Sequence, residues 1–199
     1  AKSKKMKHLF ILLSFVLLAQ MGWSQNGLTQ LTSDVTYLAD DKLEGREIGT
    51  KGEELAAIFI AERYAEIGLT PKGTDGYFQT FSRKQEQDPH STAAADTGRV
   101  VGRNVAGFID NGAKTTVVIG AHYDHLGYGS HGSLHSGEPA IHNGADDNAS
   151  GIAVMLMLAE KLKSDAKSNN YLFIAFSGEE RGLWGSNYFT KEPTLKLDD

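Results

Sequence analysis

The spacing of apolar residues predicts two amphipathic helices in the first third of the chain. Near its start, apolar residues recur at intervals of three and four, which is the period of one helix face: Leu28, Leu31, Val35 and Leu38. A second helix is expected from Glu53 to Ile67, with Gly68 and Pro71 as stop signals. The stretch from Ser82 to Gly98 is polar and has few large apolar residues, which is typical of a surface loop or linker.

From Val101 onward the pattern changes to strands separated by a helix. Strands are expected from Asn104 to Asp110, from Thr115 to Ala121 and from Tyr171 to Phe176. Asn111 and Gly112 predict a tight hairpin turn between the first two strands. Apolar residues at helical spacing predict a helix before the third strand, and a short helix is expected from Gly182 to Phe189. A strand, a crossover helix and another strand predict a parallel unit in an α/β sheet.

The N-terminus has the three parts of a secretory signal. Lysines come first, an apolar run from Leu9 to Ala19 follows, and the small residues Gly22 and Ser24 precede a possible cleavage site before Gln25. The alternative is a membrane anchor, but this run is too short to span the roughly 30 Å of hydrocarbon in a bilayer. We therefore expect export to the periplasm or the cell exterior, with no stable membrane anchor. The predicted segments are a signal peptide over residues 1–24, a helical segment and loop over 25–100, and part of an α/β domain over 101–199.

Composition narrows the possible chemistry. The 199 residues are 40% hydrophobic with a formal net charge of −5, which indicates a globular protein and argues against a nucleic-acid partner. The chain contains no cysteine, so disulfides, thiolate zinc sites and a cysteine nucleophile are excluded. Any metal or catalytic site must therefore be built from other side chains.

Three polar clusters occur where an α/β sheet places its ligands. His122 to His125 follows one predicted strand, Asp146 to Asn148 opens the crossover helix, and Glu179 with Glu180 follows the next strand. Ligands of open α/β sheets bind outside the carboxyl ends of the strands, so these clusters are expected to converge. Imidazole and carboxylate groups bind zinc at about 2.0–2.2 Å without any thiolate. The order of the clusters therefore predicts a metal site.

The residue types also suggest a division of roles. In extended backbone, Asp124 lies on the same side as His122 while Tyr123 points away, which suits a carboxylate that orients the imidazole. Only one of the adjacent residues Asp146 and Asp147 is expected to face the metal. One carboxylate of the Glu179–Glu180 pair would bind the metal, and the other would take a proton from water.

Each cluster also has a plainer interpretation. The His-x-Asp sequence is commonly a loop hydrogen bond, the Asp-Asp-Asn sequence is a helix cap, and the Glu-Glu pair suits an acidic first helical turn. The remaining histidines of this region have solvated side chains in the simplest interpretation: His125, His131, His135 and His142. A histidine-rich loop can also collect metal opportunistically.

Three ordered blocks of sequence resemble the signature of a known family. They are GAHYDHLG at residues 120–127, GADDNASG at 144–151 and FSGEERGLWGS at 176–186. Upstream, LEGREIGT at residues 43–50 and GYFQTF at 76–81 are similar to its N-terminal region. The blocks resemble metallopeptidase family twenty-eight, the exported di-zinc aminopeptidases of the bacterial leucyl aminopeptidase type. The resemblance implies a three-layer α/β/α zinc-exopeptidase fold (phosphorylase/hydrolase-like) with a mixed, largely parallel sheet.

The resemblance also implies specific roles. His122 would bind one zinc ion, Glu180 the other, and Asp147 both. Asp124 would orient His122, and Glu179 would be the general base. The peptide bond from Asp147 to Asn148 would be cis. The expected substrates are peptides with a free N-terminus, and the expected cofactors are two Zn²⁺ ions.

The chain departs from the family pattern by omission. The family has two further ligands, an aspartate and a histidine, for which no counterpart is found before Asp199. The resemblance therefore implies a domain that is incomplete at its C-terminus, with weak zinc binding and little activity in the 199 residues alone. The alternatives are a carboxypeptidase, a glutaminyl cyclase-like enzyme with one zinc, and a metal-free binding module on the same fold.

Overall fold

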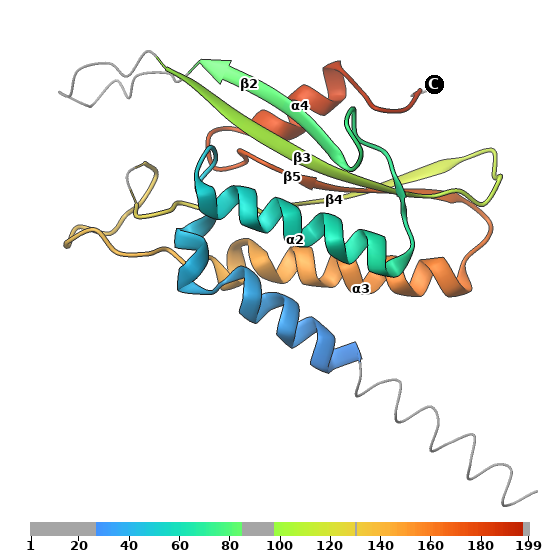
Figure 1. Ribbon diagram of the computed structural model, residues 1–199, viewed down its shortest axis with the longest axis horizontal. Coiled ribbons are helices and arrows are strands. Elements are labelled where there is room, and N and C mark those ends of the chain that lie inside the picture. Colours follow the sequence, from blue (N-terminus) through green and yellow to red (C-terminus); the bar gives the residue numbers. More distant parts are fainter. Residues whose placement is uncertain (1–26, 85–97, 130, 197–199) are drawn as a thin grey trace, which may run out of the picture.

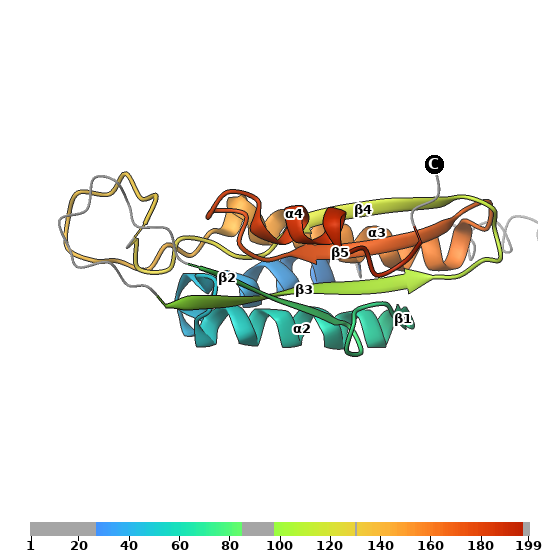
Figure 2. The same cartoon turned by 90° about the horizontal axis from the view of Figure 1, so that it is seen from above.

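A three-layer arrangement of helix, sheet and helix is seen in the computed structural model, which describes residues 27–84, 98–129 and 131–196. The elements are, in order, a helix over residues 27–38, η1 (Asp41–Arg46), α2 (Lys51–Ile67), β1 (Thr70–Pro71), β2 (Phe78–Lys84), β3 (Arg99–Ile109), β4 (Thr116–His122), η2 (Ala145–Ala149), α3 (Ser150–Asp165), β5 (Asn170–Phe176) and α4 (Trp184–Lys191). Helices α2 and α3 cover one face of the sheet, and α4 lies on the other (Figures 1 and 2). The predicted signal peptide lies outside the described residues.

The sheet is mixed. Its strands follow the order β1-β3-β5-β4, and β2 also pairs with β3. Strands β4 and β5 are parallel and are joined through α3, whereas β1, β2 and β5 all run antiparallel to β3. The predicted parallel unit and the α/β fold class are therefore confirmed. The expectation of a largely parallel sheet is not met in the described residues, where only β4 and β5 pair in parallel and β3 pairs antiparallel with each of its neighbours.

The predicted hairpin at Asn111 and Gly112 is wrong, because β5 lies between β3 and β4. The turn at Asn111 is instead hydrogen-bonded to the start of β5. The Asn111 side chain donates to the carbonyl of Asn169 at 2.7 Å, and the Asn170 side chain accepts from the main-chain N–H of Asn111 at 2.9 Å. A turn sequence of this kind favours a local bend but does not determine which strands pair across it.

The segment before residue 100 contributes strands that the sequence pattern did not predict. β2 pairs with β3 along its whole length, and Ser82, expected in a loop, lies within β2. Most of that expected loop, residues 85–97, lies outside the described residues. The second predicted helix is present as α2, with Thr50 as its N-cap and Gly68 as its left-handed C-cap. Gly68 has a φ of 81°, which a glycine adopts without steric cost.

The alternating side chains of β5 divide the core between the two faces of the sheet. Tyr171, Phe173 and Ala175 pack with α2 and α3, whereas Leu172 and Ile174 pack with Phe189 of α4. Because both faces are covered, the strand reads as a continuous apolar run in the sequence. Within the described residues, no helix is long and apolar enough to cross a membrane.

We expect Phe173→Ala to lower the free energy of unfolding by about 3–5 kcal/mol, because a fully buried aromatic side chain is replaced by a cavity. Denaturant titration of the whole protein measures this change. Val154→Ala on α3 is the control, since Val154 is half exposed and its truncation should change the free energy by about 0.5 kcal/mol or less. Equal effects of the two substitutions would contradict this assignment of the core.

Candidate metal centre

The three polar clusters meet at one end of the sheet. His122 is the last residue of β4, Glu179 and Glu180 follow β5, and Asp147 lies in η2 just before α3. The carboxyl ends of β4 and β5 and the start of α3 lie together at the left of Figure 1. The peptide bond between Asp147 and Asn148 is cis, as expected from the family resemblance.

His122 is oriented by main-chain contact and faces two carboxylates. Its Nδ1–H donates to the main-chain carbonyl of Asp124 at 3.2 Å, so Nε2 carries the lone pair in the neutral ring. That nitrogen lies 3.0 Å from Asp147 Oδ1 and 4.0 Å from Glu179 Oε2. Two facing acceptor atoms repel unless a cation lies between them. This donor set therefore fits a metal ion. Both Asp146 and Asp147 are exposed, and it is the carboxylate of Asp147 that faces His122.

Glu180 lies beside His125, which the sequence pattern treated as a solvated side chain. The Nδ1–H of His125 donates to Glu180 Oε1 at 2.6 Å, and only 12% of the His125 side chain is exposed. One ligand atom from each of His125, Asp147 and Glu180 lies within 4.8 Å of the others. The solvated interpretation of His125 is therefore wrong. The sequence feature that could have indicated a role for His125 in the site is its position in the same cluster as His122.

Asp124 connects the two strand-end loops through its carboxylate. Oδ1 accepts the N–H of Glu179 at 3.0 Å and Oδ2 accepts the N–H of Glu180 at 3.3 Å. Its carboxylate is 3.8 Å from His122 Nδ1, which is beyond hydrogen-bond range, so it orients the imidazole through its main chain. Burial raises the pKa of Asp124 to about 7, and the N–H of Glu179 acts in the opposite direction.

The guanidinium of Arg46 fixes the loop that leads to Asp147. It is fully buried and donates only to main-chain carbonyls in the described structure: those of Leu38, Tyr123, Asn143 and Gly144. Burial lowers the pKa of Arg46 to about 10, while Asp124 and Asp147 act to raise it. The side chain therefore remains charged at neutral pH, and it holds the ends of two loops together.

Glu53 connects α2 to the loops that follow β4 and β5. Its Oε1 lies 2.5 Å from the Tyr123 hydroxyl and accepts from Ser177 Oγ at 2.8 Å. The Tyr123 hydroxyl is also 2.6 Å from the carbonyl of Arg103, and its single proton serves only one of these two acceptors. A protonated Glu53 would supply the second proton. Burial raises the pKa of Glu53, which agrees with that state.

The plainer interpretations of the clusters are partly correct as well. The side chain of Asn148 caps the start of α3 by accepting the N–H of Gly151 at 3.0 Å. Of the other histidines, His142 contacts Ser133 Oγ at 2.7 Å through its Nε2. A helix cap and a candidate metal ligand, Asn148 and Asp147, are therefore neighbouring residues of one segment.

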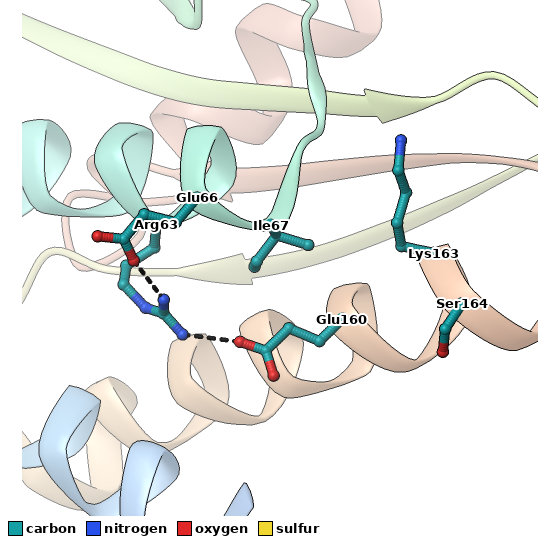
Figure 3. A pocket seen from close by; sticks show the side chains of 6 residues that line it. All are labelled: Arg63, Glu66, Ile67, Glu160, Lys163 and Ser164. Atoms are coloured by element: carbon teal, nitrogen blue, oxygen red, sulfur yellow. Dashed lines mark hydrogen bonds and ion pairs between the residues drawn. The ribbon is translucent and has the colours of Figure 1, made fainter.

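A hollow of about 280 Å³ lies between the C-terminal halves of α2 and α3, away from this centre. Arg63 spans it and pairs with Glu66 and Glu160 (Figure 3). Since these charges satisfy one another, the hollow shows no reactive group.

Sequence comparison gives a consistent result. Residues 104–198 match the model of Peptidase family M28. The chain is 30% identical over 152 residues to the alkaline phosphatase isozyme conversion protein of Escherichia coli (strain K12), covering 74% of this chain and 41% of that protein. It is 38% identical over 73 residues to aminopeptidase YwaD of Bacillus subtilis (strain 168), covering 37% of this chain and 13% of that protein. The chain thus spans less than half the length of these relatives.

Solved structures share the fold. A Zn-dependent exopeptidase from Parabacteroides distasonis ATCC 8503 has a TM-score of 0.62 at 19% identity, covering 84% of this chain and 56% of that one. A Bacteroides thetaiotaomicron glutaminyl cyclase bound to N-acetylhistamine has a TM-score of 0.61 at 16% identity. The match covers 87% of this chain and 57% of that one. At these identities the likeness concerns the fold alone, and it confirms the zinc-exopeptidase fold expected from the motifs.

We expect Arg46→Met to lower the free energy of unfolding by about 3 kcal/mol or more, because several buried carbonyls lose their donor. Urea titration measures the loss. Arg99→Met is the control: Arg99 is exposed on β3, so its substitution should change the free energy by about 0.5 kcal/mol or less. If the Arg46→Met protein is as stable as the control, the carbonyls do not depend on this guanidinium.

Glu53→Gln is expected to raise the stability of the protein at pH 8 relative to wild type and to have little such advantage at pH 4. Burial raises the pKa of Glu53 above its ordinary value of 4.5, so the unfolded chain loses this proton first as pH rises. The wild-type free energy of unfolding therefore falls above pH 4.5, whereas glutamine has no such titration. Thermal unfolding of both proteins across this range measures the difference. A difference that stays constant with pH would rule out this titration.

Proposed function

Because residues 104–198 of this chain belong to Peptidase family M28, we propose that the whole protein is an exported di-zinc aminopeptidase. It would hydrolyse the first peptide bond of peptides that have a free N-terminus. The observation that carries this proposal is the facing pair of His122 Nε2 and Asp147 Oδ1 at 3.0 Å, with Glu179 beside it. The similarity to an aminopeptidase of Bacillus subtilis supports the same substrate class.

The residues of the chain divide the reaction between binding and proton transfer. His122, Asp147 and Glu180 would hold zinc, with Asp147 shared between two ions. Zinc supplies Lewis-acid polarisation of the scissile carbonyl and of water. Glu179 is partly exposed and lies at the edge of the centre, so its carboxylate can accept a proton from the attacking water and return it to the leaving amine.

Export is the second part of the proposal. It is based on the basic start, the apolar run and the small residues within residues 1–24. A site made of imidazole and carboxylate ligands suits an exported enzyme, since it contains no thiolate that could be oxidised.

Glu179→Gln is expected to lower the turnover of an unblocked leucyl peptide by about 10²–10⁴-fold, because the amide cannot accept the proton from water. Zinc content after desalting should match wild type, since Glu179 is not among the proposed ligands. Amino acid release and zinc content are measured on the whole protein. The matched control is Glu62→Gln on the exposed side of α2, which should retain wild-type turnover.

Peptide chemistry decides between the proposal and its rivals. An N-acetylated peptide should not be cleaved by an aminopeptidase. Release of residues from the C-terminus would indicate a carboxypeptidase, and loss of ammonia from an N-terminal glutamine without residue release would indicate a glutaminyl cyclase. Full turnover by the Glu179→Gln protein would remove Glu179 from the role of general base.

A further inference from the structure

His125 and Glu180 form the shortest contact between an imidazole and a carboxylate in the described residues. Nδ1 of His125 lies 2.6 Å from Glu180 Oε1. Both side chains are largely buried, with 12% and 20% exposed. The pair lies beside Asp147, whose carboxylate atom is within 4.8 Å of both.

The geometry distinguishes two roles for this histidine. Two ligands on one tetrahedral zinc ion, each at about 2.0 Å, are separated by about 3.3 Å. The 3.0 Å between His122 Nε2 and Asp147 Oδ1 is close to that value. The 2.6 Å between His125 and Glu180 is far shorter and matches a charge-assisted hydrogen bond. His125 therefore contacts the carboxylate rather than sharing its metal.

The ring of His125 is held by the segments around it. Its main-chain N–H donates to the carbonyl of Arg46 at 3.3 Å. Gly144, with a φ of 57°, passes so close that a Cβ there would lie 2.7 Å from the ring. The segment leading to Asp147 thus packs directly against His125. Its conformation leaves room for this ring only because residue 144 has no side chain.

We propose that His125 is a positioning residue, whose Nδ1–H holds Oε1 of Glu180 so that Glu180 binds the metal through Oε2 alone. This inference rests on the proposed function, since it assumes that Glu180 is a ligand. Hydrogen bonds to ligating side chains fix their orientation and raise metal affinity. The same bond sets the tautomer of His125, with the lone pair on Nε2.

Metal titration of the whole protein tests the proposal without measuring activity. The dissociation constants of Zn²⁺ and Co²⁺ are measured by competition with a chelator, and the visible absorption spectrum of the Co²⁺ protein reports the ligand atoms. His125→Leu should weaken binding by about 10–100-fold. His125→Asn should restore the wild-type affinity and spectrum, because its side-chain N–H can reach the position of Nδ1–H. His135→Leu is the matched control, since His135 is exposed in the loop before η2.

The outcomes separate the two proposals. If wild-type protein binds neither ion, the proposed function fails and this inference fails with it. If wild type binds but His125→Leu retains its affinity, only the positioning role is overturned. If His125→Asn weakens binding as much as His125→Leu and alters the cobalt spectrum, His125 is a ligand and not a positioning residue. Thermal unfolding of each variant verifies that the fold is retained.

Discussion

The buried guanidinium of Arg46 is the interaction on which the candidate metal centre depends. A cation without solvent is costly to bury unless hydrogen bonds replace its hydration, and here main-chain carbonyls take that role. The planar group donates in several directions at once, so it joins the loop after β4 to the loop before α3. Lysine has one nitrogen and could not span the same carbonyls. The position of Asp147 relative to His122 is therefore fixed by a residue far upstream in the sequence.

Two buried carboxylic acids, Asp124 and Glu53, also hold the loops of the candidate metal centre in place. Asp124 receives two main-chain N–H groups from the loop after β5, and Glu53 connects α2 to Tyr123 and Ser177. Both have raised pKa values because burial disfavours their charged forms. The more open carboxylates of Asp147, Glu179 and Glu180 converge on one place. Negative charges gathered in this way favour a cation between them, which is why this place is the candidate metal centre.

Local patterns predicted most of the fold around the site. The continuous apolar run of β5 and the helical spacing in α3 gave a parallel unit that the structure contains. The turn at Asn111 gave a wrong hairpin, because the partner of β3 is chosen by the burial of β5 and not by the turn. Strands β1 and β2 were missed for a similar reason. Only two of the seven side chains of β2 are buried, so its pattern is weak until it pairs with β3.

The sequence by itself determined the chemistry: the absence of cysteine, the three clusters of His, Asp and Glu, and their order along an α/β unit. Those features depend on residue type and spacing, which the chain carries directly. Only the tertiary structure decided which side chains meet. It turned the main-chain carbonyl of Asp124 toward His122, directed the Asp124 carboxylate to the opposite loop, and brought His125 onto Glu180. These contacts join residues 2 to 55 positions apart, and their directions follow from packing around Arg46 and Gly144, which no local pattern encodes.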